Sequence, residues 1–104
     1  MNGNFNDRII SGWYWTQLPS CTNTPLGDNV GAYGYLEVID IFGSSSDVLQ
    51  RWTNYYDGDT WVRNNTNGWK SWVRYLTSNN YSSYCLPLSG GTMTGRITLA
   101  STGF

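Results

Sequence analysis

Hydrophobic and polar positions alternate along much of this chain with the period of two that β-strands show. The clearest strand is predicted over residues 34–42, where apolar side chains occupy both faces. The residues of the two faces are, in turn, Leu36, Val38 and Phe42, and Tyr35, Ile39 and Ile41. Because both faces of this strand are mostly apolar, we expect it to be a central strand of the sheet.

Turn residues divide the remaining alternation into further strands. The turn Asp57-Gly58-Asp59 predicts a tight hairpin, because an Asp-Gly pair tolerates the positive φ that such turns require. A long loop that contains two prolines is predicted over 18–28. The other predicted strands are 9–15, 48–56, 60–64 and 69–76.

The last of these segments, 69–76, fits two periods. The helical period is met by Trp69, Trp72, Val73 and Leu76. The alternation of a strand fits the same segment, and its aromatic and β-branched residues favour a strand. Since no Ala or Glu supports a helix there, we predict a strand.

Composition points to the same fold class. A length of 104 residues, with 39% hydrophobic and 16% aromatic residues, suits a single domain. The abundant Asn, Gly, Thr, Ser, Trp and Tyr are poor helix formers, so we predict an all-β protein. Only 12% of the residues are charged, which leaves the polar surface to Asn, Ser, Thr and Gly, as is common in secreted, virion and cell-surface β proteins.

The charge pattern argues against nucleic acid and membrane partners. The formal net charge is -1, and the six Lys and Arg residues are spread singly, so no basic patch is available to neutralise phosphates. No apolar run approaches the roughly 20 residues that span a bilayer. The first residues also lack the charged and apolar regions of a signal peptide, so none is expected.

The residue types that carry catalysis or bind metals are scarce. The chain has no histidine, which excludes Ser-His-Asp and Cys-His arrangements. Asp57 and Asp59 flank a glycine but supply too few oxygens for calcium. Cys21 and Cys85 lack metal-ligand spacing and are predicted to be free thiols, although a disulfide between them stays open. We therefore predict no enzyme, no cofactor and no metal.

The carboxy-terminal residues differ in character from the rest. A Gly/Thr-rich stretch is followed by a short apolar strand around Ile97 to Leu99 that has no partner strand in sequence. Because strand backbone groups need partners, we expect this strand to pair with another chain or with sequence beyond this one. The predicted divisions are 1–9 as an N-terminal extension, 10–77 as the folded module, 78–85 as a joint and 86–104 as a separate segment.

Two parts of the sequence resemble known proteins. The stretch Leu86-Pro87-Leu88-Ser89-Gly90-Gly91-Thr92-Met93-Thr94-Gly95-Arg96-Ile97 resembles a motif that recurs in the tail fibres of phages and prophages. Residues 10–76 are similar, in order and spacing, to the knob domains named after pyocin tail fibres. The segments that carry this second likeness are Gly12-Trp13-Tyr14, Pro25, Gly34 to Val38, Gln50-Arg51-Trp52, Trp61-Val62-Arg63 and Trp69 to Trp72.

The resemblance implies a small antiparallel β-sandwich-like knob with a C-terminal fibre strand, assembled as a homotrimer. It implies a virion protein, assembled in the bacterial cytoplasm, whose partners are other tail-fibre or baseplate proteins and a bacterial surface glycan or lipopolysaccharide. The expected function is attachment to the host surface by multivalent carbohydrate binding. The alternatives are a purely structural spacer in the fibre and a carbohydrate-active enzyme module.

The aromatic residues are the candidates for contacts. Large core residues are needed in a domain this small, so core or subunit packing is predicted for Trp13, Trp52, Trp61, Trp69 and Trp72. A second group lies near turns or polar runs and is expected to be exposed, where its rings could stack on sugars. These receptor-contact candidates are Trp15, Tyr33, Tyr55, Tyr56, Tyr81 and Tyr84. Arg63 is expected to stack on Trp69 or Trp72, or to bind a turn carbonyl.

Overall fold

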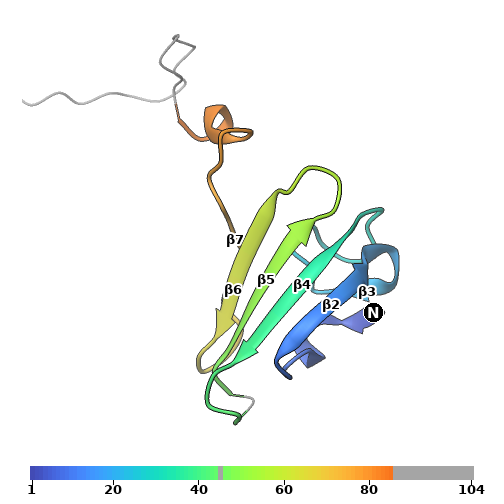
Figure 1. Ribbon diagram of the computed structural model, residues 1–104, viewed down its shortest axis with the longest axis vertical. Helices are drawn as coiled ribbons and strands as arrows, with labels where there is room; N and C mark the ends of the chain where they lie inside the picture. The colour runs from blue at the N-terminus through green and yellow to red at the C-terminus, as the bar shows by residue number, and fades with distance from the viewer. Residues whose placement is uncertain (45, 86–104) are drawn as a thin grey trace, which may run out of the picture.

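The chain folds around a five-stranded antiparallel sheet (Figure 1). This computed structural model describes residues 1–44 and 46–85. The strand order is β2-β4-β5-β6-β7. The bounds are Gly12–Gln17 for β2, Tyr33–Asp40 for β4, Val48–Asn54 for β5, Thr60–Asn65 for β6 and Val73–Arg74 for β7. The predicted C-terminal fibre strand falls outside the described residues.

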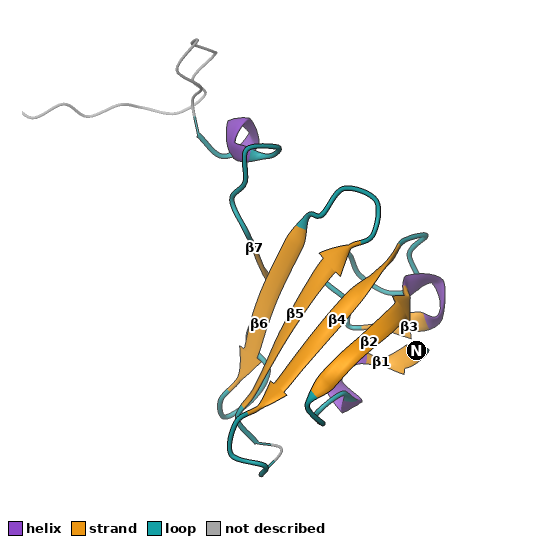
Figure 2. Ribbon diagram, in the orientation of Figure 1, coloured by secondary structure: helices purple, strands orange, loops and turns teal. Residues whose placement is uncertain are grey.

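The all-β, antiparallel fold class is confirmed, because the helices within the described residues are short 3-10 turns (Figure 2). The middle position of β4 is also confirmed, since it pairs with β2 on one side and β5 on the other. The predicted hairpin joins β5 to β6, and Gly58 has the left-handed φ of 75° that its turn was expected to require.

The strand predicted over 69–76 is wrong in length. Only Val73–Arg74 pairs with β6 as β7, and Trp69 makes an isolated bridge to Asn65. The physical reason is a side-chain contact that alternation cannot reveal. The Trp69 and Trp72 rings both pack on the Arg63 guanidinium, which takes the segment between them out of the sheet.

A thin second layer covers one face of the sheet. It contains the two-stranded parallel sheet of β1 (Gly3–Asn4) and β3 (Cys21–Thr22), together with the 3-10 turns η1 (Phe5–Asp7) and η2 (Leu18–Ser20). The core lies between these elements and the sheet. Its buried hydrophobic residues are Phe5, Leu18, Cys21, Ala32, Leu36, Val38, Val48 and Trp52.

Trp52 is the largest residue of this core and is fully buried. Its indole Nε1–H donates to Thr16 Oγ1 at 2.8 Å, and the Thr16 hydroxyl donates to the Gly34 carbonyl at 2.8 Å. Both polar groups are therefore satisfied inside the core, as burial requires. The rings fit because Gly34 has no side chain, since a Cβ there would lie 2.6 Å from the indole.

Gln50 links the N-terminal segment to the sheet through hydrogen bonds. Its side chain is fully buried, and its Nε2 donates to the carbonyls of Phe5 at 2.6 Å and Arg8 at 2.9 Å. Its Oε1 accepts from Arg63 Nε at 2.9 Å. A single amide therefore holds the second layer and the Arg63 side chain in place.

The opposite face of the sheet is not covered by any described residue. Tyr35 and Ile39 of β4 are exposed there. Phe42 lies beyond the end of β4 and is exposed instead of sharing a face with Leu36. The uncovered face is the surface on which the predicted aromatic residues gather.

Candidate functional site

The open face is defined here as the uncovered side of the five-stranded sheet. Its members follow from the alternation along each strand and from the register that places residues opposite one another. They are Trp13, Trp15, Gln17, Tyr33, Tyr35, Glu37, Ile39, Leu49, Arg51, Thr53, Tyr55, Thr60, Val62, Asn64, Val73 and Tyr75. A continuous surface this rich in exposed aromatic and aliphatic side chains is typical of interaction sites.

An aromatic cluster occupies one end of the open face. Trp15 lies at its centre and stacks on Tyr33 with ring centroids 6.2 Å apart and an interplanar angle of 12°. The rings of Tyr35 and Tyr55 meet Trp15 edge-on at 5.6 and 5.4 Å, and Tyr56 meets Tyr55 edge-on at 5.1 Å. Such mutual packing holds exposed rings in fixed positions.

Four of the six predicted contact residues belong to this cluster. Trp15, Tyr55 and Tyr56 are exposed, and Tyr33 is partly buried. They come from β2, from β4 and from the turn after β5, which the register brings to one end of the sheet. Tyr35 completes the cluster and was not among the predicted contact residues.

A charged pair lies on the open face next to the cluster. Arg51 forms an ion pair with Glu37 directly across the β4–β5 ladder. Trp13 Nε1 donates to Glu37 at 3.0 Å, and Arg51 Nε donates to the Tyr75 hydroxyl at 2.8 Å. The hydrogen bond to Tyr75 and the nearby Glu37 carboxylate raise the pKa of Arg51, so the guanidinium stays charged.

This pair is at the base of a shallow hollow of about 220 Å³ lined by Trp13, Tyr35, Glu37, Arg51 and Thr53. The flat rings can stack on apolar C–H faces, and the carboxylate and guanidinium can bond to hydroxyl groups. Glu37 is the single carboxylate of the open face as defined above. A pair of acids of the kind that hydrolyses glycosides is therefore not assembled on this surface.

Trp13 differs most from the sequence-based expectation in how far its side chain is exposed. It was expected to pack in the core or between subunits, but in the single chain it is 82% exposed. The other four tryptophans of that group behave differently, since Trp52 is buried in the core and Trp61, Trp69 and Trp72 pack against it. The signal for Trp13 was its alternation with Tyr14, which places it on the face opposite to the core.

The other two predicted contact residues, Tyr81 and Tyr84, lie apart from the cluster. Both are exposed and belong to the turn η3 (Tyr81–Ser83) and its end. The Tyr84 hydroxyl accepts from Arg74 Nη1 at 3.1 Å. These two tyrosines therefore sit where the chain leaves β7, and the open face does not include them.

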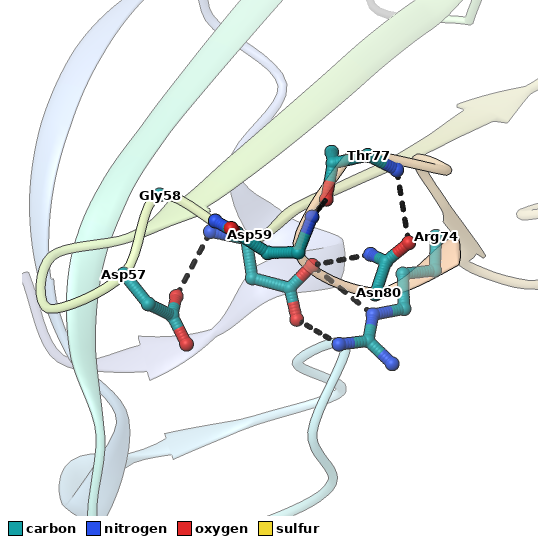
Figure 3. Close-up of a pocket in the computed structure, with 7 residues that line it drawn as sticks. Asp57, Gly58, Asp59, Arg74, Thr77 and Asn80 are labelled. Atoms are coloured by element: carbon teal, nitrogen blue, oxygen red, sulfur yellow. Dashed lines mark hydrogen bonds and ion pairs between the residues drawn. The ribbon is translucent and has the colours of Figure 1, made fainter. Parts of the chain in front are cut away.

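A second hollow lies beneath this exit and is shown in Figure 3. It has a volume of about 130 Å³. Asp59 forms an ion pair with Arg74, whose Nε donates to Asp59 Oδ1 at 3.0 Å, and the same oxygen accepts from Asn80 at 3.3 Å. The Asn80 Oδ1 accepts from the Thr77 amide at 2.9 Å.

The polar groups of this second hollow bond mainly to one another. The hydrogen bonds to the Asp59 carboxylate and, to a smaller extent, to the Tyr84 hydroxyl raise the pKa of Arg74. The network ties residues 77–80 to the β5–β6 turn and thereby sets the direction in which the chain leaves the sheet. Its evident role is to anchor this exit.

Metal ligands do not gather within the described ranges. No group of three or more His, Cys, Asp or Glu side chains among residues 1–44 and 46–85 could hold an ion. In the same part of the chain, no helix has the length and apolar character needed to cross a membrane. Both cysteines are free thiols, with Cys21 buried and Cys85 exposed.

Comparison with known structures identifies where this architecture occurs. A structure of the C-terminal part of the P. aeruginosa R1 pyocin fibre matches 99% of this chain with a TM-score of 0.62 and 24% identity. An N-truncated R2-type pyocin tail fibre matches 98% with a TM-score of 0.63 and 21% identity. The chain has the fold of a pyocin-fibre segment. A P. aeruginosa R2 pyocin fibre matches 97% of it, with a TM-score of 0.61 and 24% identity.

The likeness concerns part of each pyocin fibre. The chain spans 28% of the R1 fibre structure and 45% of the N-truncated R2-type fibre structure. No protein-family model matches the sequence, and no curated protein matches it either. At these identities the pyocin comparison establishes the fold.

Proposed function

We propose that the chain is a module of the tail fibre of a phage or phage-like particle, which attaches the particle to its bacterial host by binding surface carbohydrate. The observation that carries the proposal is the aromatic cluster, exposed on the open face of a domain that shares its fold with pyocin fibres. The fibre motif of residues 86–97, which lies outside the described residues, agrees with this assignment. On this proposal the protein is a virion component, and it has other fibre or baseplate proteins as partners.

The aromatic cluster suits sugar binding because its rings are both exposed and fixed. Trp15 and Tyr55 hold each other edge-on, so little side-chain entropy is lost when a sugar stacks on them. The neighbouring Glu37–Arg51 pair offers an acceptor and donors for hydroxyl groups. The proposed ligand is a surface glycan or lipopolysaccharide of the host.

A trimer would turn weak contacts into firm attachment. Three aromatic clusters on one fibre raise the effective concentration of each for the same cell surface, so that modest single-site affinities give a long residence time. The proposed homotrimer is held by the carboxy-terminal fibre segment. Tyr81 and Tyr84, which stand beside that exit, are proposed as additional contacts.

The proposal is tested by binding of the purified chain to host cells and to a glycan array. We expect binding that is lost when Trp15 and Tyr55 are both changed to Ala, because stacking of aromatic rings contributes about 1 kcal/mol or more per ring. The matched control is Phe42→Ser, which removes a ring that is 74% exposed but lies outside the cluster. Equal binding by the double variant and the parent chain would rule out the cluster as the contact site.

A structural spacer is the second candidate, and the anchored exit at Asp59, Arg74 and Asn80 favours it. An element that transmits direction along a fibre needs a fixed exit of this kind. Absence of binding to every natural host strain, by a chain that assembles normally, would favour the spacer. Release of oligosaccharides from host capsule or lipopolysaccharide would instead support the enzyme alternative, for which no observation speaks at present.

A further inference from the structure

A third hollow lies on the covered side of the sheet, away from the open face. It has a volume of about 350 Å³ and is bounded by η1, by the loop around Asp28 and by the segment that follows β6. The lining side chains that matter here are Asn6, Asp28, Arg63, Trp69, Lys70 and Trp72.

Arg63 is a buried cation that forms no ion pair with any described residue. It is only 6% exposed, and its guanidinium carbon lies 4.0 Å from the Trp69 ring centroid and 4.5 Å from that of Trp72. Within the described residues it takes part in no ion pair, and its Nε donates to a neutral amide, Gln50 Oε1. Burial lowers the pKa of Arg63 to about 10, so the side chain is still charged at neutral pH.

Two buried polar atoms, in residues that line this hollow, lack partners within the described residues. They are Arg63 Nη2, a donor, and Asn6 Oδ1, an acceptor. Buried polar groups are nearly always hydrogen-bonded, because a buried donor or acceptor without a partner has lost its bonds to water and gained none in return. Arg63 and Asn6 therefore bring an unused donor and an unused acceptor next to one hollow, and a polar ligand that both accepts and donates would satisfy them.

The charge of the hollow is positive. Lys70 stands exposed at its edge and adds a second cation to Arg63. Asp28, whose Oδ1 accepts from the Asn23 amide at 2.8 Å, is the one acid among the lining residues, so one carboxylate stands against two cations and the balance is positive. An anion is therefore the ligand that the electrostatics favour, with two indole rings available to pack against its carbon skeleton.

We infer that this hollow binds an acidic sugar, whose oxyanion provides the counter-charge to Arg63 and Lys70 and whose hydroxyl donates to Asn6. The oxyanion is a carboxylate or a phosphate, and both have acceptor oxygens suited to a guanidinium. The anion site follows from the unpaired groups alone. That the anion is carried by a sugar rests on the proposed attachment function.

The site can be tested by following the indole N–H signals of the whole chain by NMR during titration. Trp72 Nε1–H donates to the Asn23 carbonyl at 3.1 Å, at the border of the hollow, so its signal reports on occupancy. The titrants are glucuronate, glucose 6-phosphate, inorganic phosphate and neutral glucose, all at constant ionic strength. We expect saturable shifts of the Trp69 and Trp72 signals with at least one acidic sugar, and none with glucose.

Charge variants separate the site from a general electrostatic effect. Lys70→Gln is expected to weaken binding about 2- to 5-fold, as loss of one exposed charge partner does. Arg8→Gln removes a positive charge outside the hollow and is expected to change nothing. Arg63→Gln is expected to abolish binding, and the Lys70 variant keeps the inference testable if the Arg63 variant does not fold.

The outcomes are distinct. The inference is overturned if no anion gives a saturable shift, if the Lys70 and Arg8 variants weaken binding equally, or if inorganic phosphate binds but neither acidic sugar does. Binding of glucuronate alone or of glucose 6-phosphate alone identifies the oxyanion as carboxylate or phosphate. Attachment to cells that persists without any acidic-sugar binding defeats this inference and leaves the proposed function standing. Acidic-sugar binding by a chain that does not attach to host cells defeats only the proposed function.

Discussion

Gly34 in β4 shows how closely one residue can be determined by its neighbours. A Cβ at this position would lie 2.3 Å from the Thr53 carbonyl oxygen and 2.6 Å from the Trp52 ring. Neither neighbour can give way, because the oxygen belongs to the ladder between β4 and β5 and the ring fills the core. The glycine is therefore required for space, and its φ is not in the left-handed region.

Gly34→Ala should destabilise the fold severely. Overpacking a rigid site of this kind costs about 3 kcal/mol, which would appear as a lower urea midpoint at unchanged slope. Gly31→Ala is the matched control, because nothing lies within 4 Å of the Cβ that it would add. It should shift stability by no more than about 0.5 kcal/mol. A Gly34 variant as stable as the control would contradict the packing described here.

The two cysteines should differ sharply in reactivity. Cys21 is fully buried and its thiol donates to the Gln17 carbonyl at 3.1 Å, whereas Cys85 is exposed. Burial raises the pKa of Cys21 above 9.0, so its reactive thiolate is scarce. At pH 8 we expect one rapid reaction per native chain with a disulfide reagent, and a second only in denaturant.

The Cys85→Ser variant identifies the rapid thiol, since it should react only when unfolded.

The raised pKa of Cys21 also has a consequence for the stability of the fold. The protonated Cys21 thiol stabilises the fold fully below about pH 9, and this contribution is lost as the pH rises further, because the unfolded thiol ionises first. Two rapid reactions in the native parent chain would contradict the burial of Cys21.

At the scale of elements, alternation and turn residues predict the three long inner strands to within two residues at each end. The predicted 34–42, 48–56 and 60–64 correspond to Tyr33–Asp40, Val48–Asn54 and Thr60–Asn65. These strands are determined locally, by side-chain period and by the turn at Gly58. The ends of the sheet depend instead on long-range contacts that sequence alone does not show.

The N-terminal layer and the open face illustrate that limit. Phe5 lies in the core, and its carbonyl is bonded by Gln50, which stands 45 positions later in the chain. Packing of that layer on one side of the sheet leaves Trp13 uncovered on the other, although a tryptophan is ordinarily expected inside. Exposure of Trp15, Tyr55 and Tyr56 was predictable from nearby turns, but their assembly with Tyr33 required the register.

Gln50→Leu tests whether this amide holds the N-terminal layer. The change keeps the side-chain volume but leaves the carbonyls of Phe5 and Arg8 and the Arg63 Nε without their partner. The expected loss of unfolding free energy is about 3 kcal/mol, with faster hydrogen exchange in residues 1–9. Gln17→Leu, at an exposed position of β2, is the control and should leave both quantities near the parent values.

At the scale of the whole molecule, residues 1–44 and 46–85 cover the sheet on one face and leave the other open. The hydrophobic effect favours covering the other, either with ligand, as proposed for the aromatic cluster, or with sister chains. The strand predicted from the sequence for the carboxy-terminal segment bears on this choice, because strands with unpaired edges find partners in other chains. A closed trimer satisfies three such edges at once.

The full chain should therefore run as a trimer in light scattering coupled to size exclusion, with a mass near three times 11.7 kDa. A chain cut after residue 85 separates the two sources of association. If the fibre segment holds the trimer, the shortened chain is a monomer whose aromatic cluster stays accessible. If the shortened chain is still a trimer, and Trp13→Ser on the open face dissociates it, then sister chains cover that face. The glycan-binding site would then have to lie on another surface of the chain. If the full chain is a monomer at about 100 μM, the argument that several weak sites act together fails.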